Sequence, residues 1–118
     1  ADKTFFIADS LRAELISKMD IPPIPMLGLL KWQKDYEMLT EFFDEEQHYA
    51  VLAGAKQAAE EIEQMDQNRM TRNHWRLLMK IYDMISSSYT AIDEPEKSAE
   101  YDEKVEDIAF IHGFDRFS

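Results

Sequence analysis

The feature that most constrains the fold is the spacing of apolar residues, which recur every three or four positions. The clearest set has spacings of 3, 4, 3 and 4 and consists of Leu29, Trp32, Tyr36, Leu39 and Phe43. This spacing places all members on one face of an α-helix, which then packs against another helix. Only three glycines and four prolines interrupt the 118 residues. The sequence therefore predicts one all-α domain over residues 1–118, with terminal segments at 1–8 and 113–118.

A short N-terminal helix and a proline-rich linker are expected before the main bundle. Asp9 or Ser10 can cap a helix that runs to about Met19, because their side-chain oxygens accept the free amides of a first turn. The sequence IPPIP at 21–25 ends this helix, since proline lacks the amide donor and disfavours helical geometry in the preceding residue. We expect residues 21–25 to be extended.

Four main helices should follow and form the bundle. They are expected at 26–43, at 45–66, from a cap at Asn68 or Thr71 to Tyr89, and from Pro95 to His112, where Gly113 ends the last helix. Asp44 and Gln47 resemble a capping box, which favours a break near residue 44. One unbroken helix over 26–66 is the competing interpretation, but it would be long for a small domain.

Two of the expected helices, the one at 45–66 and the one that ends at Tyr89, have distinctive faces. In the first, the stretch AVLAGAKQAA is rich in small side chains, so a neighbouring helix can approach it closely. The expected helix that ends at Tyr89 carries apolar residues around more than half of its circumference, which predicts a central position. Trp75 belongs to this helix, and its replacement by alanine is expected to cost about 3–5 kcal/mol if the ring is buried.

The composition limits the classes of partner. The chain carries 24 acidic and 13 basic residues, for a net charge of −11, and it has no cysteine. Phosphates require a basic surface, so direct binding of nucleic acid is not expected, whereas basic proteins would be attracted. The sequence has no run of about 18 apolar residues, so a membrane span is not expected. The lack of cysteine fits a reducing compartment, and we expect a cytoplasmic protein without disulfides or thiolate chemistry.

One residue pair raises the question of a metal site. Glu45 and His48 are three positions apart, a spacing that can place both side chains on one helix face. Di-iron sites in bundles need two such pairs and two more glutamates, but Thr71 and Ala109 stand three residues before the other histidines. We therefore assign the pair to the start of a helix and expect no metal and no cofactor.

An acidic stripe is the strongest candidate for a binding surface. Its members, spaced 4, 3 and 4 apart, are Glu96, Glu100, Glu103 and Asp107. They line one face of the last helix, opposite Tyr101, Val105 and Ile108. Neighbouring carboxylates would lie roughly 6 Å apart along the axis, a spacing comparable to that of phosphates along a nucleic-acid strand. The alternative is an ordinary solvated helix face flanked by Lys97 and Lys104.

The chain also has more large apolar residues than its helix stripes require. These residues are Phe5, Phe6, Ile7, Met38, Phe42, Phe110, Phe114 and Phe117. Phe114 and Phe117 follow the last helix and are expected to be exposed. Some of the surplus apolar residues can form a patch for a partner or for a second copy of the chain. Alternatively, both chain ends can fold back and cover one end of the bundle.

The sequence thus predicts a protein that binds without catalysis. No Gly-x-Ser-x-Gly elbow surrounds the three consecutive serines, and no glycine loop suits a phosphate. We expect no catalytic residues and a small regulator, adaptor or inhibitor of a protein partner. The residues expected to contact this partner are Glu96, Glu100, Glu103, Asp107, Phe114 and Phe117. One alternative is a DNA mimic that blocks a nucleic-acid-binding protein, and another is a metalloprotein built on Glu45 and His48.

Overall fold

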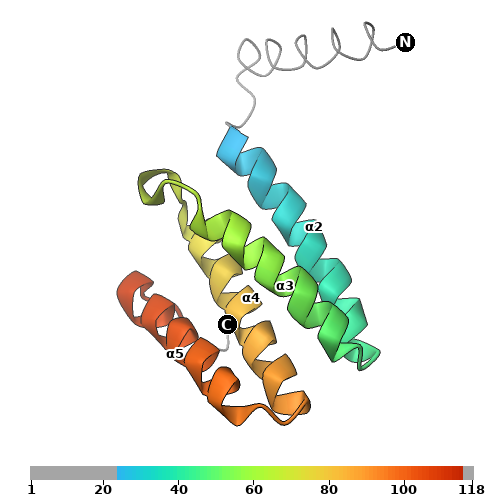
Figure 1. Cartoon of the computed structure of the whole chain (residues 1–118). Helices are drawn as coiled ribbons and strands as arrows, with labels where there is room; N and C mark the ends of the chain where they lie inside the picture. Colours follow the sequence, from blue (N-terminus) through green and yellow to red (C-terminus); the bar gives the residue numbers. More distant parts are fainter. Residues whose placement is uncertain (1–23, 116–118) are drawn as a thin grey trace, which may run out of the picture.

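The computed structural model describes residues 24–115, which form an all-α fold (Figure 1). Four α-helices and one 3-10 turn succeed one another along this part of the chain: α2 (Ile24–Asp44), α3 (His48–Glu63), η1 (Gln67–Arg69), α4 (Arg72–Ala91) and α5 (Pro95–His112). The prediction of an all-α fold with four main helices is confirmed. The expected helix at 9–19 lies outside the described residues.

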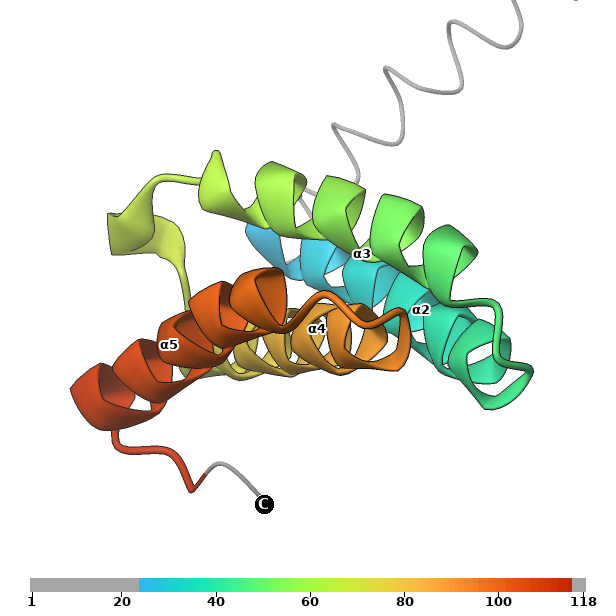
Figure 2. The ribbon, with the colours of Figure 1, turned by 60° about the horizontal axis from the view of Figure 1, so that its bottom comes forward.

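Helix α4 lies at the centre of the bundle, as its broad apolar face predicts. It packs against α2, α3 and α5, and α3 also packs against α2. In Figure 1, α4 runs between α3 and α5, and Figure 2 shows α3 and α5 on different sides of it. Helices α3 and α5 therefore meet through α4 and hardly contact each other directly.

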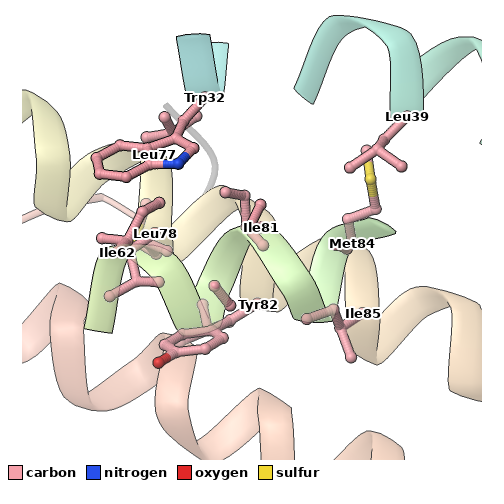
Figure 3. Packing of buried hydrophobic residues seen from close by; sticks show 14 of the residues in the cluster. Trp32, Leu39, Ile62, Leu77, Leu78, Ile81, Tyr82, Met84 and Ile85 are labelled. Carbon is pink, nitrogen blue, oxygen red and sulfur yellow. The ribbon is translucent and has the colours of Figure 1, made fainter. Parts of the chain in front are cut away.

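The core is made of side chains of α4 and of the side chains that α2, α3 and α5 pack against it. Figure 3 shows Trp32 and Leu39 of α2 and Ile62 of α3 beside side chains of α4. Ile62, Ile81 and Ile85 are fully buried. The small-sided stretch of α3 allows the close approach expected of it, because a Cβ atom at Gly54 would lie only 2.7 Å from Cδ2 of Leu39 on α2. Removal of this apolar surface from water stabilises the bundle.

Three helices end with a residue in the left-handed conformation. Glu46 follows α2 with φ 62°, Asp93 follows α4 with φ 63°, and Gly113 follows α5 with φ 69°. After α2, the amide of Glu46 donates to the carbonyl of Phe43 at 3.0 Å, and that of Gln47 to the carbonyl of Phe42 at 2.9 Å. These two bonds form a Schellman motif, which satisfies carbonyl groups at the helix end.

The expected capping box at Asp44 is therefore wrong, although the break near residue 44 is confirmed. Helix α2 continues through Asp44, and the chain then uses residues 45–47 to reverse direction. Gln47 is the residue before α3, and its side chain forms no capping hydrogen bond. Helix α3 thus starts at His48 and not at residue 45.

The expected extension of residues 21–25 is also wrong at its end. Helix α2 begins at Ile24, so Pro25 occupies the first helical turn. Proline is tolerated there because a first-turn amide has no partner within the helix. Residues 21–23 lie outside the described part.

Thr71 is the cap of α4, as one of the two expected candidates. Its hydroxyl oxygen accepts from the amide of His74 at 3.4 Å, and Nδ1 of His74 accepts from the amide of Thr71 at 3.0 Å. The pair forms a capping box in which histidine takes the place usually held by glutamate or glutamine. His74 is fully buried, so the helix start is fixed within the core.

Trp75 lies at the edge of the core and not inside it. Its side chain is half-buried, and its ring stacks on His112 of α5 with a centroid distance of 4.2 Å. The helical pattern correctly placed Trp75 on the apolar face of α4. The expectation of a large buried site is wrong, because the side chain of Trp75 remains partly exposed.

Candidate functional site

The four carboxylates of the acidic stripe lie on the outer face of α5. All of Glu96, Glu100, Glu103 and Asp107 are exposed. Val105 and Ile108, on the opposite side of the helix, are buried against α4. At a rise of about 1.5 Å per residue, successive carboxylates are about 4.5–6 Å apart along the axis. The structure therefore confirms that the four residues share one exposed face.

No basic side chain between residues 24 and 115 forms an ion pair with this stripe. Within that part of the chain, the one ion pair joins Lys31 to Glu61 at 3.1 Å, on α2 and α3. The two lysines beside the stripe lie near tyrosine rings: Nζ of Lys97 is 5.7 Å from the ring centroid of Tyr89, and Nζ of Lys104 is 5.4 Å from that of Tyr82. Neither lysine is in direct ion-pair contact with a carboxylate of the stripe.

Two large apolar residues continue the stripe toward the end of α5. Phe110 is 89 % exposed and Ile111 is 71 % exposed. Phe110 follows Asp107 by three positions, so the spacing of the stripe extends to it. From the sequence, Phe110 was counted only among the surplus apolar residues, and Ile111 was not singled out. Extension of the stripe by one more step would have found Phe110.

Phe114 is buried, so the expectation that its ring is exposed for a partner is wrong. Its exposed fraction is 8 %. The left-handed Gly113 turns the chain back, and the amide of Phe114 donates to the carbonyl of Ala109 at 2.9 Å. The ring then lies under two cations of α4, with its centroid 4.4 Å from Cζ of Arg72 and 5.4 Å from Cζ of Arg76. Phe117, the other expected contact, lies outside the described residues.

Glu45 and His48 do not share a helix face. Glu45 lies in the turn after α2, whereas His48 is the first residue of α3. The His48 ring packs edge-on against Phe43 at a centroid distance of 5.1 Å. Among residues 24–115, no group of three or more histidine, aspartate or glutamate side chains is arranged to hold a metal ion. The assignment of both residues to the start of one helix is wrong for Glu45, and the two side chains do not form the helical pair that a metal site would use.

A hydrogen-bonded pair, Tyr82 and Glu63, lies between α3 and α5. The hydroxyl of Tyr82 on α4 donates to a carboxylate oxygen of Glu63 at the end of α3. Burial, together with this hydrogen bond, raises the pKa of Tyr82 above its ordinary value of 10.0. Sequence reasoning missed this pair, because its members come from separate helices and have no shared spacing.

Comparison with known proteins gave no match: no family model, no curated protein and no solved structure is significantly similar to this chain. None of the helices within residues 24–115 has a stretch long and apolar enough to cross a membrane.

Proposed function

We propose that the protein binds a basic protein partner through the outer face of α5 and acts as a small regulator, adaptor or inhibitor without catalysis. The observation that carries this proposal is the combination of two features on one helix. Four carboxylates without an ion pair to the described residues run along the face, and the exposed side chains of Phe110 and Ile111 stand at its end.

The two features have different roles in recognition. The carboxylates attract a basic partner, suppress acidic ones and speed the encounter. Aromatic side chains supply most of the affinity at many interfaces, and full burial of a phenylalanine contributes about 1.5–3 kcal/mol. The ring of Phe110 is 89 % exposed, so almost all of its surface is available for such burial.

The carboxylate spacing also supports a second candidate function, that of a DNA mimic. Four exposed carboxylates follow one another along α5 at intervals close to those of phosphates along a strand. A mimic would occupy a basic groove chiefly by charge. Its complex should weaken steeply with salt, because screening acts on exposed charges. The apolar end of the face favours a partner that also offers an apolar pocket.

The proposal is tested by comparison of captured proteins among variants. The protein is immobilised, exposed to lysate of its native host, and the bound proteins are quantified by mass spectrometry during steps of rising salt. We expect one partner to be lost when Glu100 and Glu103 are both changed to lysine, and to be weakened about 10-fold or more by Phe110→Ala. Because the four positions of the stripe are exposed, the charge reversal should change the free energy of unfolding by less than about 0.5 kcal/mol.

Matched controls remove the same groups elsewhere. The double reversal Glu41→Lys and Glu60→Lys changes the net charge equally on α2 and α3, and Leu30→Ala removes an exposed apolar side chain from α2. The partner should be retained by these controls. A protein lost equally from both sets of variants would show only general attraction to acid and would contradict a site on α5. Release by moderate salt without any effect of Phe110→Ala would favour the mimic.

A further inference from the structure

A pocket of about 260 Å³ opens between the end of α3, η1, α4 and α5. It exists because α3 and α5 both pack on α4 but hardly contact each other (Figures 1 and 2). Met70, Trp75, Leu78 and Ile108 supply its apolar wall. Of these, Leu78 and Ile108 are buried in the core, so the wall is set by the fold.

Charged groups face this pocket from two opposite helices. Glu63 comes from α3, whereas Lys104 and Asp107 come from α5. Tyr82 also lines the pocket, and its hydroxyl donates to Glu63. The Lys104 ammonium lies 5.4 Å from the Tyr82 ring centroid and 5.8 Å from that of Tyr101. The two carboxylates and one ammonium leave the pocket with one excess negative charge.

We infer that the pocket receives an arginine side chain of the partner. This inference rests on the proposed function, because Asp107 belongs both to the acidic stripe and to the pocket. A guanidinium is weakly hydrated, stacks on aromatic faces and pairs with carboxylates, and its aliphatic stem can contact apolar walls. Trp75 supplies the aromatic surface, and Glu63 and Asp107 supply the acceptors. The chemistry of the walls therefore complements both parts of an arginine side chain.

A small probe can test this pocket without the partner. The probe is N-acetyl-arginine methylamide, titrated into the full chain at low salt and followed by two-dimensional NMR of amide and indole N–H groups. The indole signal of Trp75 should shift in a saturable way. The signal of Trp32 serves as the internal reference, because that buried indole donates to Glu61 at 2.8 Å and does not line the pocket. The citrulline analogue has the same shape without the charge, and it should bind several-fold more weakly.

Charge variants fix the sign of the effect. Glu63→Gln retains an acceptor for the Tyr82 hydroxyl and should weaken probe binding several-fold, whereas Lys104→Gln should strengthen it by removing a competing cation. Glu96→Gln, on the stripe but away from the pocket, should leave probe binding unchanged. The spectrum of each variant shows whether it is folded. Equal shifts with the arginine and citrulline probes, no saturable shift of Trp75, or weaker binding after Lys104→Gln would each overturn the inference.

The two proposals can fail separately. Loss of the partner in the stripe variants with no probe binding would leave the function on α5 intact and remove the arginine pocket. Probe binding with no partner lost from the Phe110→Ala or charge-reversed protein would contradict the function proposed for the outer face.

Discussion

The structure predicts that truncation of the fully buried Ile81 lowers the free energy of unfolding more than truncation of the larger but only half-buried Trp75. Ile81 is fully buried among other core side chains, and Ile81→Ala removes three carbons from this enclosed site (Figure 3). Buried isoleucine-to-alanine changes cost about 2–5 kcal/mol, and we expect about 4 here. Trp75 is half-buried at the edge. Its change to alanine should therefore cost about 2 kcal/mol, roughly half of the value for an enclosed tryptophan.

Urea unfolding followed by circular dichroism measures both changes. With a slope of about 2 kcal/mol/M, the midpoint should fall by about 2 M for Ile81→Ala and by about 1 M for Trp75→Ala. Ile81→Val, expected to cost about 1 kcal/mol, keeps the test usable if the alanine variant does not fold. A larger loss for Trp75→Ala than for Ile81→Ala would refute the assignment of Trp75 to the edge of the core.

Three further predictions concern the helix ends and the buried hydroxyl. Glu46 has φ 62°, so Glu46→Gly should raise the free energy of unfolding by about 0.5–1 kcal/mol in thermal denaturation, whereas Glu45→Gly beside it should bring no gain. Thr71→Ala removes the capping oxygen of α4 and should cost about 1 kcal/mol in urea, while retention of full stability would show that His74 alone secures the helix start. The pKa of Tyr82 is raised on folding, so the neutral form is favoured in the fold, and its contribution is complete below pH 10 and lost as pH rises above that value. The free energy of unfolding, measured between about pH 9 and 11.5, should therefore fall as the pH rises. This fall should be smaller in Tyr82→Phe, whereas the control Tyr49→Phe, at an exposed ring, should leave it unchanged.

The elements that sequence reasoning placed well depend on local spacing. Leu29, Trp32 and Leu39 are buried in α2 as their seam predicts, because the helical repeat alone decides which side chains share a face. The same reasoning placed Val105 and Ile108 inward and the acidic stripe outward on α5. Pro95 and Gly113 marked the limits of α5 because each residue type suits the backbone at that position.

The features that could not be predicted depend on contacts between distant segments. Phe114 looks exposed in the sequence because it follows the last helix. Its burial requires that Arg72 and Arg76 lie beside the end of α5, and these residues are about forty positions away. The start of α3 was misplaced for a different reason. Glu46 adopts the left-handed conformation that normally signals glycine, so no residue type announced the turn.

Salt dependence connects the exposed stripe to the pocket beside it. Charges on the open face of α5 lose most of their long-range attraction once the Debye length falls to about 8 Å at physiological ionic strength. An arginine in the proposed pocket would lie between Glu63 and Asp107 and be partly shielded from water by the apolar wall, so its contribution should fall less with added salt. A partner that uses both should therefore show a steep loss of affinity at low salt that levels off at high salt. Glu63→Gln should lower this residual affinity, whereas Glu96→Gln should reduce the initial slope. A complex whose affinity falls with the same slope at all salt concentrations in both variants would place all of its binding on the exposed stripe.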